Sequence, residues 1–267
     1  MNLDFDQIPV PFGMRPGLRR LDPATPQLTP LDPGSRLWAE KSAVFQARQS
    51  RHGVPGFDPA PALRAIADRA GGTSAHRGAF EDSLELAFEE DLAVLDGVTG
   101  TLPWLCVCVP SHWAPEDKLG LDFTALHAPV ADNAALISAS RQLVALVTAG
   151  ERWERIVWTL SPSGRYDQHP RRQGRTPWPP AQDPDAFAGQ CWLRAERQTF
   201  FPVGQGTRQA VFTIRVMLQP LIDSIEAPWQ AGRLRDSLAS MSPAVLAYKN
   251  LTAAREPLLR WLDARAA

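Results

Sequence analysis

The sequence predicts an α+β fold in which an antiparallel β-sheet has N-terminal and C-terminal helices on its flanks. Hydrophobic residues recur at helical spacing in residues 35–97 and again after residue 220, whereas strand-like segments occur between residues 105 and 218. This order predicts about four or five antiparallel strands with one crossing helix, and helices must cover at least one face of the sheet. With 267 residues, 44% of them hydrophobic, the chain can bury a sizeable core.

The first 35 residues are expected to form an extended, proline-rich arm that lies over the domain. Proline interrupts helices because it lacks the backbone N–H and clashes with the preceding turn. The prolines of this segment stand at positions 9, 11, 16, 23, 26, 30 and 33. Residues 36–267 contain no internal repeat and are expected to form a single domain with C-terminal helices.

Three helices are predicted before the sheet. Residues 35–51 have helical spacing, and a short helix follows at residues 61–70. Residues 80–95 place a large apolar side chain about once per helical turn, with Gly97 in the position of a C-cap. The acidic run 89–91 is then expected to be the solvated face of this third helix.

Strands are predicted from β-forming residues and alternating polarity at 105–109, 155–161, 190–200 and 209–218. The last two are expected to pair as an antiparallel hairpin through the glycine-containing residues 201–208. Residues 133–149 have helical spacing and form the crossing helix between strands. The arginine- and proline-rich segment 162–184 has no periodicity and is expected to be a long loop.

The chain is expected to end in helices. Pro220 is expected to begin one of them, and residues 251–265 form the last. Ser242 followed by Pro243 is typical of a helix N-terminus, because a serine hydroxyl caps free backbone N–H groups and proline fits the first helical position.

Composition excludes several classes of protein. The net charge of −1 gives no reason to expect a nucleic acid or an anionic membrane as a partner. The N-terminus lacks the basic and apolar regions of a signal peptide, and no apolar run approaches the roughly 20 residues of a membrane span. Three cysteines without an export signal favour reduced thiols and a cytoplasmic location.

His127 is the main candidate metal ligand. It lies in Leu-His-Ala-Pro-Val, and a proline two residues later restricts the turn that holds it. Imidazole is the usual axial ligand of haem iron in oxygen chemistry. Lys118, Arg194, Arg197 and Arg215 are cations beside or on predicted strands and could pair with haem propionates. The alternative for the strand charges is an exposed edge strand whose side chains form surface ion pairs.

The sequence gives little support to a zinc site or to hydrolytic chemistry. Cys106, Cys108, Cys191 and His112 are possible zinc ligands, but structural zinc sites prefer cysteines separated by two to four residues on a turn, and free cysteine is also a common core residue. The sequence contains no Gly-x-Ser-x-Gly, Gly-x-Gly-x-x-Gly or Walker motif. It therefore does not predict a hydrolase or a nucleotide-binding protein of these types.

Several motifs taken in order resemble the alpha-subunit family of haem-dependent oxidative N-demethylases. They lie at residues 16–22, in the helix containing Trp38, and at 88–92, 113–120, 126–130, 155–158, 193–199 and 211–215. The resemblance implies a PAS-like domain that binds haem b and O₂ and removes a methyl group from a small secondary amine such as dimethylamine, releasing formaldehyde. Because the chain has no flavin, nicotinamide or iron–sulfur motif, a separate reductase subunit with flavin and a [2Fe–2S] centre is implied.

The resemblance also implies roles for particular residues. His127 corresponds to the proximal haem ligand and Lys118 to a propionate partner. Glu196, Arg197 and Thr213 are the candidate catalytic residues of the distal pocket. Arg194 and Arg215 complete the set of candidate cofactor-binding residues. Here the histidine motif continues with Val130 where a second proline is expected, which could alter the turn.

The sequence leaves two alternatives to a haem oxygenase open. The first is a PAS-like protein that binds haem or another small ligand without catalysis, as a sensor does. The second is a zinc-containing or purely structural protein. Absorption spectra and metal analysis would separate the three.

Overall fold

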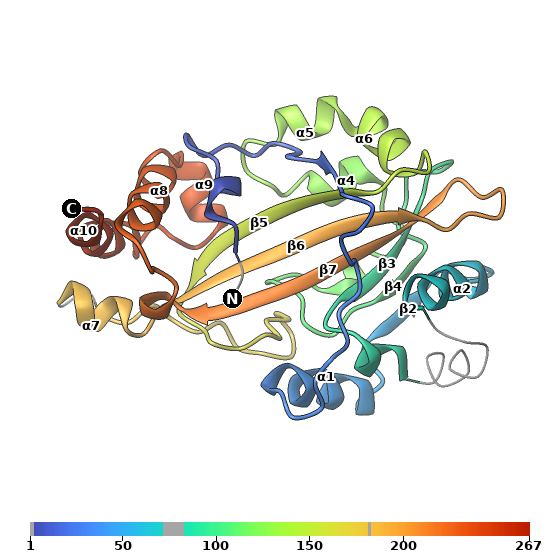
Figure 1. Cartoon of the computed structure of the whole chain (residues 1–267), viewed down its shortest axis with the longest axis horizontal. Coiled ribbons are helices and arrows are strands. Elements are labelled where there is room, and N and C mark those ends of the chain that lie inside the picture. The colour runs from blue at the N-terminus through green and yellow to red at the C-terminus, as the bar shows by residue number, and fades with distance from the viewer. Residues whose placement is uncertain (1–2, 72–82, 181–182) are drawn as a thin grey trace.

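A computed structural model describes residues 3–71, 83–180 and 183–267. This part of the chain is α+β, as predicted, and its seven-stranded sheet is antiparallel throughout, in the order β1-β5-β6-β7-β3-β4-β2 (Figure 1). The strands are β1 (Arg19–Arg20), β2 (Arg51–Gly53), β3 (Asp91–Asp96), β4 (Trp104–Cys106), β5 (Trp153–Ser161), β6 (Trp192–Pro202) and β7 (Gln209–Pro220). The two outermost strands have only two and three residues, too few for alternation to be recognised in the sequence.

The predicted hairpin is confirmed as β6 and β7, which pair from Trp192 opposite Pro220 to Pro202 opposite Ala210. Alternation along these strands and β5 gives the sheet two different faces. The face that carries Arg155, Glu196 and Phe212 is called the α4 face below. The opposite face, with Trp158, Leu193 and Thr213, is called the C-terminal face.

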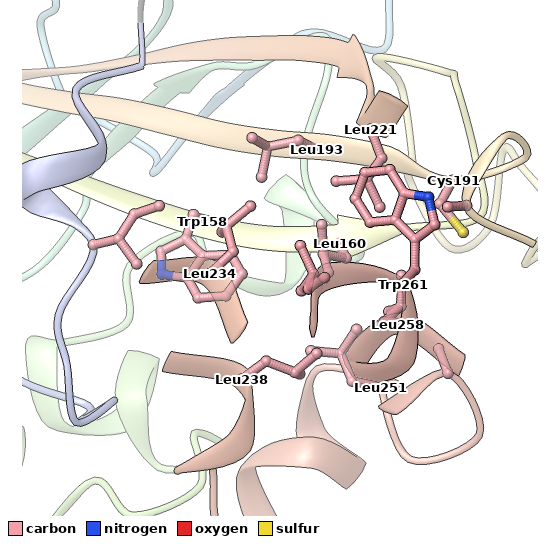
Figure 2. Packing of buried hydrophobic residues seen from close by; sticks show 14 of the residues in the cluster. Trp158, Leu160, Cys191, Leu193, Leu221, Leu234, Leu238, Leu251, Leu258 and Trp261 are labelled. Carbon is pink, nitrogen blue, oxygen red and sulfur yellow. The ribbon is translucent and has the colours of Figure 1, made fainter. Parts of the chain in front are cut away.

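The C-terminal helices cover one end of the C-terminal face. They are α8 (Pro228–Ala239), α9 (Pro243–Tyr248) and α10 (Arg255–Ala266), and α9 begins as predicted with the Ser242 hydroxyl accepting from Val245 N–H. Figure 2 shows their apolar side chains packed against Trp158, Leu160 and Leu193 of the strands. The helix expected at Pro220 is a single 3-10 turn, η3 (Leu221–Asp223).

The α4 face is covered by three short helices, α4 (Phe123–His127), α5 (Ala134–Ser138) and α6 (Ser140–Val147). Leu126 and Val147 from these helices join the apolar cluster that contains Leu105 of β4. The crossing helix predicted at 133–149 is divided, because Ala139 leaves the helical conformation with ψ near 1°. The three helices follow β4 and precede β5 in the chain, which is the position that the sequence predicted for one crossing helix.

Of the remaining helices, two lie near β2 and the third lies beside α10 (Figure 1). The helix α1 (Arg36–Gln46) is shorter than predicted because the chain turns at Arg48, in a left-handed conformation, and enters β2. The helix α2 (Ala60–Arg69) agrees with the prediction, and α7 (Pro184–Ala188) follows the long loop. No helix in the part of the chain that the structure describes is long and apolar enough to cross a membrane.

The helix predicted over residues 80–95 is wrong in its second half. Residues 83–87 are helical, but β3 begins at Asp91 and runs between β7 and β4. A central strand is buried on both faces, so its apolar residues form a continuous run that also fits helical spacing. Residues 80–82 lie outside the described residues. Gly97 caps no helix; a Cβ there would lie 2.4 Å from Thr148 Oγ1.

The acidic run 89–91 is likewise not a solvated helix face. Glu90 and Asp91 are buried, and the Lys41 ammonium lies 3.2 Å from Asp91 Oδ1 with both side chains almost inaccessible. The same ammonium donates to the carbonyl oxygens of Phe88 and Glu90. This buried group joins α1 to the start of β3.

The N-terminal segment follows an extended path over the sheet, interrupted by η1 (Phe5–Gln7) and β1 (Figure 1). Phe5 and Ile8 enter the core below the C-terminal helices, β1 pairs with β5, and Pro30 forms a bridge to Phe88. Burial of these side chains fixes the path of the segment despite its lack of regular structure.

Candidate functional site

His127 is the last residue of α4, whereas the sequence placed it in a turn before a helix. Asp122 caps the helix by accepting from Ala125 N–H. One turn later the His127 Nδ1–H donates to the carbonyl oxygen of Phe123 at 2.8 Å, and the two rings stack with centroids 4.0 Å apart. The proton on Nδ1 leaves the Nε2 lone pair unprotonated.

The surroundings of His127 keep its ring neutral. Burial is the largest cause that lowers its pKa, and the nearby cations Arg155 and Lys118 lower it further, while the bond to Phe123 acts in the opposite direction. A neutral imidazole is the form that binds a metal ion. His127 therefore has both the tautomer and the charge state that a metal ligand needs.

Lys118 follows directly after η2 (Pro115–Asp117), the 3-10 turn of the 113–120 motif. Hydrogen bonds and ion pairs from the long loop after β5 hold this turn in place. The His169 Nε2–H donates to both carboxylate oxygens of Glu116, at 3.1 and 3.2 Å, and Arg171 pairs with Glu116 and Asp117. These partners hold the pKa of Glu116 at about 2, against the effect of burial. His169 belongs to the segment predicted as a long loop, yet its side chain is buried.

A continuous row of polar side chains crosses the α4 face beside the helix α4. The Glu196 carboxylate accepts from Ser111 Oγ–H on one oxygen and from Gln198 Nε2 on the other, at 2.7 Å. Gln198 in turn accepts from Arg155 Nε at 2.8 Å, and Ser111 accepts from Arg194 Nε at 2.8 Å. We call these residues the Glu196 row. Each Glu196 oxygen is held by a neutral donor, so the carboxylate is oriented without a direct ion pair.

Arg155, Gln198 and Ser111 are functional candidates that the sequence reasoning did not single out. Arg155 belongs to a motif quoted above, but nothing in the motif indicates which way its side chain points. Its guanidinium also donates to the carbonyl oxygen of Pro16 at 3.3 Å, and it has no carboxylate ion-pair partner among the described residues. Burial lowers its pKa, and Glu196 opposes that effect. Arg155 is therefore a partly buried cation beside His127 that can still take an anion.

Arg194 lies on the same face, but its guanidinium N–H groups already have hydrogen-bond partners within the protein. Its guanidinium donates to Ser111 Oγ and to the carbonyl oxygens of Val109, Arg165 and Tyr166, and only 2% of the residue is exposed. These bonds tie two loops to β6. The structure gives Arg194 the role of a positioning residue for Ser111 rather than of a free anion ligand.

Arg197, Thr213 and Arg215 lie on the C-terminal face, opposite Glu196. Arg197 pairs with Glu154 at 3.0 Å, and Arg215 pairs with Glu89 at 2.5 Å. Thr213 is fully buried and shares a hydrogen bond with Thr199. Odd and even residues of a strand point to opposite faces, so these three residues cannot share one pocket with Glu196. The edge-strand alternative is not what the structure shows either, because β6 is paired on both sides.

The cysteines do not form a metal site in the described part of the chain. No cluster of three His, Cys, Asp or Glu side chains suited to a metal ion occurs there. All three thiols are buried, Cys191 in the core below the C-terminal helices and Cys106 in the core against α2. Burial raises their pKa values, that of Cys191 to about 12, so they remain protonated.

Comparison with protein families matches residues 79–259 to the haem-dependent oxidative N-demethylase, alpha subunit-like family. The matched segment begins before β3 and includes α4, the Glu196 row and two of the C-terminal helices. It covers more than half of the 267 residues. The chain therefore belongs to the haem-dependent oxidative N-demethylase alpha subunit-like family.

Proposed function

We propose that the chain binds haem b through Nε2 of His127 and removes a methyl group oxidatively from a small secondary amine, releasing formaldehyde. The observation that carries this proposal is the tautomer of His127, in which Nδ1–H is committed to the Phe123 carbonyl. Histidines that bind metals commonly donate their second N–H to a carbonyl oxygen in this way. Membership of a haem-dependent family supports haem as the group that is bound.

The residues near His127 fit a haem on chemical grounds. Haem carries two propionates, which need cations, and Arg155 and Lys118 are both close enough to lower the pKa of His127. Neither Arg155 nor Lys118 has an ion pair with a carboxylate among the described residues, so both cations can take a propionate. We assign the propionates to Arg155 and Lys118 and leave Arg194 and Arg215, whose guanidinium groups are already bonded, out of this role.

Bound haem supplies oxygen binding and activation at its iron. Demethylation of R–NH–CH₃ consumes one O₂, two electrons and two protons, and it yields R–NH₂, HCHO and water. The chain must therefore hold the amine and deliver protons. Glu196 is our candidate for both tasks, because its carboxylate attracts an alkylammonium group and its oxygens are oriented by Ser111 and Gln198. Arg197 and Thr213 are not retained as catalytic residues, since they lie on the other face.

The electrons are proposed to come from a separate reductase subunit with flavin and a [2Fe–2S] centre. The alpha-subunit-like family to which the chain belongs suggests partner subunits. We further propose that residues 36–267 form one PAS-like unit, supported by the antiparallel sheet with α4–α6 on one face. Three buried, unbridged cysteines support a cytoplasmic location.

Haem titration of the purified protein tests the proposal. A Soret band is expected for the wild type and for the control His52→Ala, and it should be weakened or lost in His127→Ala. Reduced, haem-loaded protein should consume O₂ and release formaldehyde when dimethylamine is added. A wild type that takes up no haem refutes the proposal. A Soret band without amine-dependent turnover leaves only the non-catalytic haem protein.

A further inference from the structure

Lys249 is a cation near the Glu196 row that the proposed function does not use. It is the residue that ends α9, and its side chain is half-buried. Its Nζ donates to the carbonyl oxygen of Trp158 at 2.8 Å and lies 5.3 Å from the centre of the Phe12 ring. An ammonium group has three N–H donors, and Lys249 has no ion pair with a carboxylate among the described residues. It therefore keeps donors for an anion.

The outer edge of β5 gives Lys249 access to the α4 face. In the part of the chain that the structure describes, β1 pairs only with Trp153 and Glu154, so residues 155–161 have no strand partner on that edge. The two faces of the sheet meet at such an edge. The charges of the α4 face therefore act on Lys249. Burial lowers its pKa to about 8, Glu196 acts against burial, and Arg155 acts with it.

The position of Lys249 is fixed at both ends of α9. At the start of the helix, the Ser242 hydroxyl donates to the Asp132 carboxylate at 2.7 Å. Directly after Lys249, Asn250 has a left-handed conformation with φ of 58°, and its carbonyl oxygen accepts from Trp178 Nε1 at 2.6 Å. The apolar side of the helix lies in the core below the C-terminal face. The cation is thus held in place before any ligand binds, which reduces the entropy lost on binding.

Lys249 and Glu196 are separated by the space that a small molecule needs. Glu196 is directly opposite Val157 in the pairing of β5 and β6, and Lys249 lies beyond Trp158, the next residue of β5. Since neighbouring strands are about 4.8 Å apart, the ammonium and the carboxylate are separated by on the order of 8 Å. An ion pair requires about 4 Å or less. A short zwitterion with a hydrogen bond of about 2.8 Å at each end spans this separation.

We propose that the amine substrate is an N-methyl α-amino acid, whose ammonium binds Glu196 and whose carboxylate binds Lys249. This inference rests on the proposed function and names the substrate class. Dimethylamine would satisfy Glu196 but leave Lys249 without an anion. With N-methylglycine, the demethylation consumes one O₂, two electrons and two protons, and it yields glycine, formaldehyde and water.

Calorimetric titration of the haem-loaded, oxidised protein without a reductant tests the substrate class, because no turnover occurs under these conditions. N-Methylglycine carries both charges, dimethylamine carries only the ammonium, and acetate carries only the carboxylate. N-Methylglycine should bind about tenfold more tightly than either of the other two, since each of them leaves one charged group of the protein without a partner. Binding of dimethylamine or acetate as tightly as N-methylglycine overturns the inference.

Variants then locate the carboxylate. Lys249→Met should reduce the preference for N-methylglycine over dimethylamine by about tenfold, and Lys249→Arg should restore most of it. The control Arg260→Met removes an exposed cation of α10 and should leave the preference unchanged. Circular dichroism checks that each variant folds. An unchanged preference in Lys249→Met overturns the inference, and so does loss of its Soret band, which would make Lys249 a propionate partner instead.

Failure of the proposed function gives a different result from failure of this inference alone. A wild type that takes up no haem refutes both. A haem-loaded protein that demethylates dimethylamine but does not prefer N-methylglycine refutes only the assignment of the substrate class. In steady-state assays with reductant, Lys249→Met should raise the KM for N-methylglycine more than it lowers kcat, because the carboxylate is remote from the methyl group that reacts.

Discussion

Replacement of Lys41 by methionine should destabilise the fold severely, although Lys41 is remote from His127. The ammonium is fully buried, lies 3.2 Å from Asp91 Oδ1 and donates to the carbonyl oxygens of Phe88 and Glu90 at 3.0 and 2.9 Å. Methionine fills a similar volume but leaves these acceptors without a donor. Breaking a buried pair by removing one partner costs about 3–5 kcal/mol, a large part of the roughly 5–15 kcal/mol that stabilises a typical domain.

Urea unfolding followed by circular dichroism measures this loss, and Lys41→Met should also lower the melting temperature by on the order of 10 °C. The double variant Lys41→Met/Asp91→Asn should lose less than the sum of the single variants, because no unpaired carboxylate remains buried. The exposed pair of Arg235 and Asp236 provides the matched control, and Arg235→Gln should change stability by less than about 1 kcal/mol.

The same pair has a defined pH dependence. Burial by itself would lower the pKa of Lys41, but the charge of the Asp91 carboxylate raises it above the ordinary value of 10.5. A raised pKa means that the contribution of the ammonium is fully present below 10.5 and is lost as the pH rises through the folded-state value. The stability difference between wild type and Lys41→Met should therefore be constant across neutral pH. A loss below about 1 kcal/mol, or strict additivity in the double variant, would refute the assignment of a buried, mutually dependent pair.

Three further predictions concern the site and its support. Because the pKa of His127 is lowered in the fold, its neutral form should persist as the pH falls below 6.5, and haem binding followed by the Soret band should weaken only at more acidic pH; loss beginning above 6.5 would contradict this. Glu196→Gln should reduce amine-dependent formaldehyde release roughly 10²–10⁴-fold while the Soret band stays, and the exposed Glu226→Gln should leave both unchanged. Gly97→Ala should lower the free energy of unfolding in urea by about 1–3 kcal/mol, because the new Cβ would lie 2.4 Å from Thr148 Oγ1 and 2.6 Å from the Arg208 carbonyl oxygen. The control Gly232→Ala, within α8, has its nearest neighbour 3.7 Å away and should raise the free energy of unfolding by up to about 1 kcal/mol. Equal effects at both glycines would refute the steric argument.

Local patterns in the sequence predicted much of the fold. The hairpin of β6 and β7, the cap at Ser242 and the α2 helix follow from alternation, capping chemistry and helical spacing over a few residues. The division of charges between the two faces of β6 was also readable, since Glu196 and Arg197 are adjacent and must point in opposite directions. The two side chains therefore cannot both line the distal pocket that was predicted for them.

The errors share one physical cause, which is burial by distant parts of the chain. Residues 89–91 look solvated because they are acidic, yet Lys41, about 50 positions away in the chain, neutralises Asp91 inside the core. Residues 91–95 look helical because a strand covered on both faces loses its alternation. Neither covering segment can be identified from the neighbours in sequence.

The sequence alone determined the α+β class and, through its ordered motifs, the family, because these depend on residue types and spacings along the chain. It also supplied His127 as the candidate haem ligand, which stays a prediction. The tertiary structure decided which side chains stand together. It placed Arg155 and Lys118 near His127 and gave Glu196 hydrogen bonds from Ser111 and Gln198. It placed Arg197 on the opposite face of the sheet, where it pairs with Glu154. Hydrogen bonds and charge effects act over a few ångströms, and only the pairing of strands sets those distances between residues far apart in sequence.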